Sequence, residues 1–352
     1  MYTQLRPVLF WIAPETTHRL TIELLHLLRY IPLSKWIMQR NLSYDDPSLT
    51  REVFGLKFKN PVGLAAGFDK NAEVVNELSC MGFGFIEIGS VTPLSQQGNP
   101  KPRVFRLPKD RAIVNHMGIN NAGAAAVAKN LKRHSRRRRV IVGGNISKNS
   151  ATPNTAAAAD YERAFVKLYD SVDYFVINVS CPNVENLRGL QDSEQLRGIV
   201  EAVTEQRKYH DTYKPVLLKL SPDLSATQIE EVLTLVFEYG LDGLVVANTT
   251  TRREDLCTPP ATLSRMASGG LSGAPLLANT MGMVRYIATL TKHQLPIIAS
   301  GGVMNEDDAL QLLNAGASLV QIYTGLIYNG PGFVKRILKR LGTSYRLVTK
   351  KS

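Results

Sequence analysis

Residues 174–181 are Tyr-Phe-Val-Ile-Asn-Val-Ser-Cys, an apolar run that turns polar at its end and is followed by Pro182. A short run of aromatic and β-branched residues predicts a strand buried on both faces, as strands of parallel sheets are. Proline cannot extend such a strand, so Asn178 and Cys181 are expected where the strand opens into a loop. Seven more runs of this type occur, at 61–67, 85–91, 140–147, 215–222, 242–249, 296–302 and 319–325.

Helical segments separate most of these runs. Ser225 and Gln228 have the spacing of a capping box, and Asn305 precedes three acidic residues that suit the first turn of a helix. Eight strand-and-helix units over 265 residues match the size of a TIM (β/α)8 barrel. The competing doubly wound sheet would use fewer strands and would need a topological switch point. The longer gap at 92–139 predicts an insertion with two extra strands, at 103–107 and 112–115.

Composition describes a globular protein with a large core, since 44% of the 352 residues are apolar and 20% are charged. The three cysteines are far apart without a C-x-x-C pair, so neither a disulfide framework nor a zinc site is indicated. No run approaches the length of a spanning helix, and no signal-peptide pattern follows Met1. A net charge of +12 favours anionic partners. The basic run at 132–139 has no interleaved aromatic residues, which favours a solvated helix end over a nucleic-acid site.

Residues 1–45 differ from the rest of the chain. Apolar residues recur at helical spacing between Glu15 and Tyr30, Pro32 stops this helix, and Ser34 is expected to cap a second helix at 35–40. Two such amphipathic helices with Trp and basic residues suit a membrane interface, but they equally suit packing on a core. The predicted segments are therefore an N-terminal extension (1–45), a barrel (46–342) and a C-terminal tail (343–352).

The strand ends of a TIM barrel form its active site, so the polar residues there are expected to meet. Lys219 within an apolar strand predicts either a buried ion pair or a lysine aimed at a cofactor. Glycines after the last two strands, at Gly301-Gly302 and Thr324-Gly325, suit a phosphate. No cluster has metal-ligand spacing, and no G-x-G-x-x-G follows the first strand. Cys181 is interpreted as an acid/base or nucleophilic cysteine, or as a buried thiol.

Several stretches together resemble the dihydroorotate dehydrogenase family over nearly the whole chain. They are Ala65-Ala-Gly-Phe-Asp-Lys70, Glu87-Ile-Gly-Ser-Val-Thr-Pro93, Gly98-Asn-Pro-Lys-Pro-Arg-Val-Phe-Arg106, Asn178-Val-Ser-Cys-Pro-Asn183, Asn248-Thr-Thr250, Gly269-Gly-Leu-Ser-Gly273 and Ser300-Gly-Gly302. The N-terminal extension looks like that of the membrane-associated, quinone-dependent class.

The resemblance implies FMN as cofactor and the oxidation of dihydroorotate to orotate in pyrimidine synthesis, with Cys181 as the base. The residues implied for FMN are Ala66, Gly67, Lys70, Ser90, Asn145, Asn178, Lys219, Ala247, Gly273, Gly302, Tyr323 and Thr324. Those implied around the substrate are Lys70, Asn115, His116, Met117, Gly118, Ile119, Asn178, Asn183, Asn248 and Thr249. His18 and Arg106 are implied on the quinone side. For a bacterial source the class implies peripheral binding to an anionic surface on the cytoplasmic face of the cell membrane.

One departure concerns the electron acceptor. The quinone-dependent class ordinarily has serine as its base, whereas Cys181 is typical of the soluble class, which uses fumarate or NAD. The alternatives are therefore a soluble-type dihydroorotate dehydrogenase or another FMN barrel oxidoreductase. From a different class, a basic, non-catalytic barrel that binds nucleic acid or membranes would lack FMN. We favour quinone as the electron acceptor. Many residues of the N-terminal extension match the quinone-dependent class, whereas the exchange of serine for cysteine as the base is a single substitution.

Overall fold

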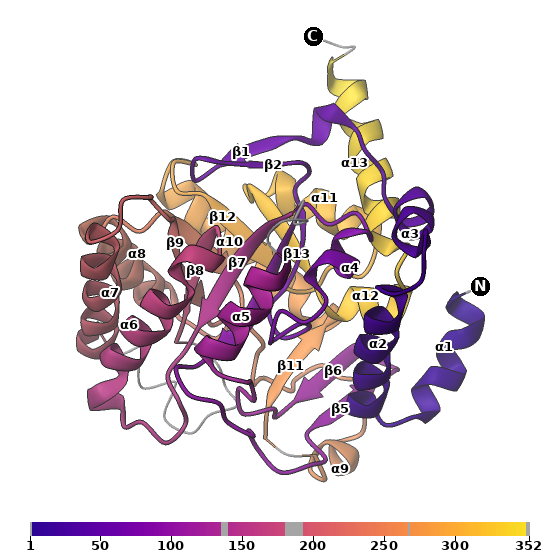
Figure 1. The fold of residues 1–352 in the computed structure, drawn as a ribbon, viewed down its shortest axis with the longest axis horizontal. Coiled ribbons are helices and arrows are strands. Elements are labelled where there is room, and N and C mark those ends of the chain that lie inside the picture. Colours follow the sequence, from indigo (N-terminus) through magenta and orange to yellow (C-terminus); the bar gives the residue numbers. More distant parts are fainter. Residues whose placement is uncertain (1, 135–139, 180–192, 267, 350–352) are drawn as a thin grey trace.

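A computed structural model describes residues 2–134, 140–179, 193–266 and 268–349. Within them eight parallel strands close into a barrel, so the predicted TIM architecture is confirmed (Figure 1). The strands are β3 (Val62–Leu64), β4 (Phe85–Val91), β7 (Ile141–Ile146), β8 (Tyr174–Asn178), β9 (Val216–Leu220), β10 (Gly243–Val246), β12 (Ile297–Ser300) and β13 (Leu319–Ile322). Each lies within one of the eight predicted runs, and the last strand pairs with the first at Val320 and Val62.

Helices surround the barrel as the alternation of patterns predicts (Figure 1). They are α4 (Val75–Ser79), α5 (Ala124–His134), α6 (Ala157–Leu168), α7 (Ser193–Lys208), α8 (Ala226–Glu238), α10 (Leu277–Leu290), α11 (Glu306–Asn314), α12 (Thr324–Asn329) and α13 (Phe333–Thr349). Two of the predicted caps are present as capping boxes, Ser225 with Gln228 and Asn305 with Asp308. Helix α13 continues without a break past residue 342, where the sequence suggested a boundary. The described residues also include short 3₁₀ turns: η1 (Pro47–Leu49), η3 (Asn154–Ala156), η4 (Tyr169–Ser171) and η6 (Ala274–Leu276).

The interior of the barrel is filled near the start of its strands. Phe58 from the hairpin of β1 (Arg51–Val53) and β2 (Leu56–Phe58) packs edge-on against Phe85, with ring centroids 5.4 Å apart. A Cβ at Gly63 would lie 2.3 Å from the Phe85 ring, so this layer leaves no space at β3. The amino-terminal end of the barrel is thus a packed core, and the active site is expected at the carboxyl end of the strands.

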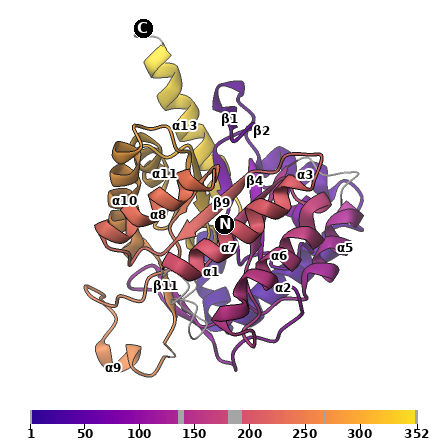
Figure 2. The same cartoon turned by 90° about the vertical axis from the view of Figure 1, so that its left-hand side faces the viewer.

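The insertion contains the two expected strands, β5 (Val104–Leu107) and β6 (Ala112–Asn115). A third strand, β11 (Gly270–Gly273), pairs antiparallel to β6 and was not predicted, because its glycine-rich sequence has no strand pattern. A short helix, α9 (Pro260–Leu263), precedes it, at the edge of the molecule farthest from the C-terminus in both views (Figures 1 and 2).

Three helices form the N-terminal part of the chain. Helices α2 (Pro14–Leu28) and α3 (Ser34–Leu42) confirm the two predicted ones, whereas α1 (Tyr2–Trp11) was not predicted as a helix. The predicted cap at Ser34 is wrong: Leu33 is the N-cap residue, and the Ser34 hydroxyl donates to the Leu28 carbonyl at the end of α2. Among the described residues no helix is long and apolar enough to cross a bilayer.

Candidate active site

A cavity of about 600 Å³ lies between the carboxyl ends of the barrel strands and the N-terminal helices. Most of the residues predicted from sequence line it: His18, Ala66, Gly67, Lys70, Ser90, Arg106, Asn115, Met117, Ile119, Asn178, Lys219, Ala247, Asn248, Thr249, Gly273, Gly302, Tyr323 and Thr324. Three others, Asn145, His116 and Gly118, are described but do not line it. Cys181 and Asn183 lie outside the described residues.

Glycine turns form the part of the cavity nearest β12 and β13. Gly302 has a φ of +84°, and a Cβ there would lie 2.3 Å from the Leu277 Cα. Gly273, with a φ of +109°, would place a Cβ 2.4 Å from the Arg111 carbonyl oxygen. Only glycine fits both sites, and the backbone is left open to a ligand. Together with the Ser272 and Thr324 hydroxyls, 2.8 Å apart, these turns fit a phosphate.

Carboxamides and a hydroxyl form a chain across the cavity. The Asn248 side chain donates to Asn178 Oδ1 over 3.2 Å, and the Asn178 side chain donates to Ser90 Oγ over 2.8 Å. The Ser90 hydroxyl in turn donates to Asn145 Oδ1, which places Asn145 behind the lining. These groups offer donors and acceptors in fixed positions, as recognition of a flat ring with imide edges requires.

Lys219 takes part in a buried ion pair and also lines the cavity. Its Nζ lies 3.9 Å from Glu87 Oε1, and the Glu87 side chain is fully buried. Glu87 also accepts hydrogen bonds from the amides of Asn145 (2.8 Å) and Gln321 (2.6 Å). The two interpretations offered by the sequence are therefore compatible. Glu87 was not predicted as a site residue, although a single acid in the apolar run 85–91 was a usable signal.

The wall opposite the barrel is apolar and comes mainly from the N-terminal helices. Thr21, Leu24 and Leu28 of α2 line it together with residues of α1 and α3. His18 packs edge-on against Phe68, with ring centroids 5.1 Å apart. Burial, reinforced by the nearby Lys70 ammonium, lowers the pKa of His18. This histidine is therefore a neutral group at physiological pH.

Arg106 joins the insertion to the turn between α1 and α2. Its guanidinium donates to the Ile12 carbonyl (2.6 Å) and to the Thr17 hydroxyl (3.1 Å), and it lies 4.6 Å from the centroid of the Phe10 ring. The residue thus holds the first two helices over the mouth of the cavity.

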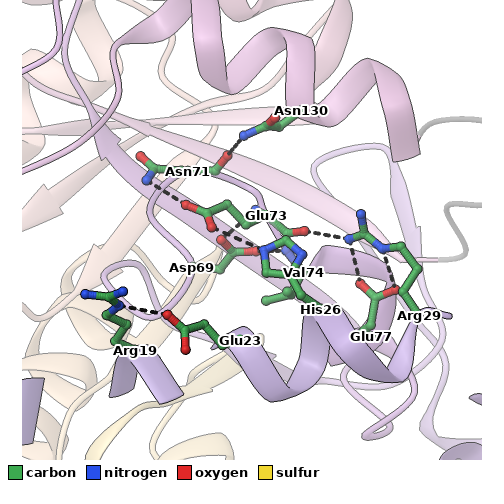
Figure 3. Close-up of polar contacts among 10 residues, drawn as sticks. All are labelled: Arg19, Glu23, His26, Arg29, Asp69, Asn71, Glu73, Val74, Glu77 and Asn130. Carbon is green, nitrogen blue, oxygen red and sulfur yellow. Dashed lines mark hydrogen bonds and ion pairs between the residues drawn. The ribbon is translucent and has the colours of Figure 1, made fainter. Parts of the chain in front are cut away.

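Charged groups also fix the end of α2 and the start of α3 to Glu73 and Glu77, before and within α4; Figure 3 shows the contacts of Arg29. Arg29 donates to the Glu73 carbonyl (2.8 Å) and to Glu77 Oε2 (3.3 Å), and Lys35 lies 2.9 Å from Glu77 Oε1. Burial alone would raise the pKa of Glu77, but the hydrogen bonds from Arg29 and Lys35 hold it below its ordinary value. The N-terminal helices are therefore part of the folded structure, because their removal would leave the buried Glu77 carboxylate without its cations.

Asp69, next to Lys70 in the same loop, is expected to make stability depend on pH. Burial raises the pKa of Asp69 to about 6, although the amides of Glu73 and Val74 donate to it. The folded state therefore binds this proton more tightly than the unfolded state. The free energy of unfolding should fall by about 3 kcal/mol as pH rises from about 4 to above 6, and then level off.

Urea unfolding of wild type and Asp69→Asn between pH 4.5 and 8 measures this contribution. The stability difference between the two proteins should change across that range, because asparagine cannot titrate. A constant difference would assign Asp69 a purely structural role.

A parallel barrel with a phosphate cradle after its last two strands and carboxamides around a cavity is the arrangement of a barrel enzyme that binds a phosphorylated cofactor or substrate. Comparison with known proteins identifies the family to which this barrel enzyme belongs. The family described as dihydroorotate dehydrogenase matches residues 48–344. The chain belongs to this family, which confirms the prediction from its motifs.

Relatives resemble the chain over nearly its whole length. The dihydroorotate dehydrogenase (quinone) of Christiangramia forsetii is 45% identical over 342 residues, covering 97% of this chain and 98% of the relative. That of Coxiella burnetii is 44% identical over 348 residues, covering 98% and 97%. The crystal structure of the Eimeria tenella enzyme in complex with ferulenol superposes with a TM-score of 0.83 at 37% identity, covering 93% of this chain and 90% of that one.

Proposed function

We propose that the protein oxidises dihydroorotate to orotate with FMN bound at the strand ends, and that a membrane quinone is the final electron acceptor. The observation that supports this most directly is one cavity lined at one end by the glycine turns and carboxamides and at the other by apolar side chains of α2. Dihydroorotate and the FMN phosphate are polar, whereas a quinone is apolar. A cavity with one polar end and one apolar end can therefore bind all three. The names of the relatives support the same reaction and acceptor.

The chain's own residues have distinct tasks in this proposal. Gly273, Gly302 and Thr324 would hold the FMN phosphate, and Lys219 would lie at the electron-rich edge of the ring. Lys70, whose ammonium donates to Asn120 Oδ1 over 2.6 Å, would pair with the substrate carboxylate. When bound, FMN supplies the acceptor for the hydride.

Cys181 is proposed to remove the proton from the ring carbon next to the one that loses hydride. A free thiol with a pKa of about 8.5 is only partly ionised at neutral pH, so nearby cations or amide donors would assist it. Asn115, Asn178 and Asn248 would orient the substrate ring through paired donors and acceptors. The protein's contribution is thus positioning and one proton transfer.

The N-terminal helices are proposed to lie on a membrane. They present many exposed apolar side chains: Leu5, Val8, Trp11, Ile12, Leu20, Leu24, Leu27, Tyr30, Ile31, Leu33, Trp36 and Ile37. So many exposed apolar side chains on neighbouring helices are typical of a membrane or protein contact. A net charge of +12 would favour an anionic bilayer. For a bacterial source the location would be the cytoplasmic face of the cell membrane.

The purified protein tests the function in two steps. Dihydroorotate should bleach the flavin absorbance of the yellow protein in stopped flow, and a long-chain quinone should restore it. Cys181 favours one other candidate, the soluble type, in which fumarate or NAD is the acceptor. Turnover with fumarate as fast as with quinone would overturn the quinone assignment, and a colourless protein that binds no FMN would overturn the reaction.

Two variants should separate the structural role of Lys219 from its role toward FMN. Lys219→Met leaves the buried Glu87 without its cation, so the free energy of unfolding should fall by about 3 kcal/mol. Adding Glu87→Gln should restore most of this stability, because the buried charge is then gone. The FMN affinity of the double variant should nevertheless stay at least tenfold weaker, as measured by fluorescence titration of the apoprotein. Recovery of full FMN affinity in the double variant would mean that Lys219 only forms the ion pair with Glu87 and does not contribute to FMN binding.

A further inference from the structure

A second hollow lies on the outside of the molecule between α3 and α13. Its volume is about 650 Å³, and we call it the α3–α13 groove. It is lined by Trp36, Gln39, Arg40, Ser43, Tyr44, Asp45, Lys335 and Lys339. None of these residues lines the cavity described above.

Three cations and one carboxylate face the α3–α13 groove. The Lys335 ammonium donates to the Asn41 carbonyl oxygen over 2.8 Å, at the end of α3, which fixes its position without neutralising it. The Arg40 guanidinium lies 5.3 Å from the centroid of the Trp36 ring. The Lys339 ammonium has no hydrogen bond or ion pair with any residue that the structure describes. With Asp45 as the acid among its lining residues, the groove has an excess of positive charge.

Neighbouring cations of the same helix are treated differently. Arg336 and Arg340 lie next in sequence to Lys335 and Lys339, and they pair with Glu306 (2.6 Å) and Asp307 (2.7 Å) at the start of α11. Helix α13 therefore has two basic edges. Arg336 and Arg340 form an edge neutralised by carboxylates, whereas Lys335 and Lys339 form an edge that faces the groove without forming an ion pair with any described residue. The open edge is the one able to bind an external anion.

The α3–α13 groove adjoins the apolar surface of the N-terminal helices. Trp36 lines the groove and is 57% exposed, and its neighbours Leu33 and Ile37 on the same segment are 71% and 50% exposed. Tryptophan favours the boundary between lipid tails and headgroups. If these side chains enter the tail region, Arg40, whose guanidinium contacts the Trp36 ring, would lie close to the lipid phosphates, with Lys335 and Lys339 in the same groove.

We propose that the α3–α13 groove binds the headgroup of an anionic phospholipid of the phosphatidylglycerol type. Arg40, Lys335 and Lys339 would contact the phosphodiester, as cations bind phosphate in general. The Asp45 carboxylate would accept a hydrogen bond from a headgroup hydroxyl. The inference rests on the proposed membrane association and adds a specific lipid to it.

Vesicle sedimentation of the full-length holoprotein tests this site. Lys335→Gln/Lys339→Gln is compared with Lys129→Gln/Lys167→Gln, which removes the same charge from exposed positions on α5 and α6. Vesicles contain either phosphatidylcholine alone or a mixture with phosphatidylglycerol. The groove variant should lose about 10- to 30-fold in affinity for the mixed vesicles, and the control pair should lose less than threefold.

The possible outcomes distinguish this inference from the proposed function. Equal losses in the two double variants, or wild-type binding without preference for phosphatidylglycerol, would overturn the groove while leaving membrane association in place. Wild type that binds neither vesicle would overturn both the groove and the membrane association. Flavin reduction by dihydroorotate should match wild type in both variants. The melting temperature of the groove variant should fall only by the small cost of losing the single Lys335–Asn41 hydrogen bond, which excludes misfolding as the cause of a loss.

Discussion

Replacing Cys181 by alanine is expected to slow the reduction of bound FMN by dihydroorotate about 10²- to 10⁴-fold, the usual cost of losing a general base. Binding of FMN should be unchanged, because its phosphate would be held by turns on other strands. Stopped-flow absorbance in the presence of excess dihydroorotate measures this step without any quinone.

Cys181→Ser is the matched control for this experiment. A hydroxyl has similar size and position but is a weaker acid, so activity should persist with its pH optimum moved upward. If the alanine variant reduces FMN at the wild-type rate, Cys181 is not the base of the reaction.

Filling the apolar end of the cavity should affect only the second half of the reaction. Thr21→Trp adds an indole to a half-buried position of α2 that lines the cavity. Reoxidation by a long-chain quinone should slow on the order of 10²-fold, because the acceptor can no longer approach in a productive position. Flavin reduction by dihydroorotate should be unaffected, since the substrate would bind among the carboxamides.

Leu20→Trp controls for this substitution. Leu20 precedes Thr21 on the same helix but is 50% exposed and does not line the cavity. Both half-reactions should proceed at wild-type rates in the control. Equal quinone rates in the two tryptophan variants would place the quinone path elsewhere.

Most of the barrel could be predicted because its signals are local. In runs such as 174–181 and 215–222 consecutive residues are mostly apolar, and this pattern reports burial on both faces of a strand. Capping residues such as Ser225 likewise act within one turn of the chain. Residues at the strand ends could be placed in one cavity because the fold itself brings those ends together.

Features that depend on distant partners were missed. Strand β11 exists through its pairing with β6, and its glycine-rich sequence has no strand pattern of its own. Glu87 gains its role from Lys219 and Gln321 on other strands. Likewise, the predicted cap at Ser34 failed because the end of α2 lies within reach of its hydroxyl. Such contacts are set by tertiary structure, which overrides local propensity.

The order of synthesis gives the pairing of Arg29 and Lys35 with Glu77 a further consequence. Arg29 and Lys35 leave the ribosome more than forty residues before their acidic partner, and Lys335 follows Asn41 by 294 residues. Translation at about 5–20 residues per second separates the two cations from Glu77 by roughly 2–10 s, and Asn41 from Lys335 by roughly 15–60 s. The nascent extension is therefore exposed to chaperones and lipid before the barrel beneath it exists. Its aggregation during that interval, rather than the stability of the finished fold, should limit the yield of recombinant protein.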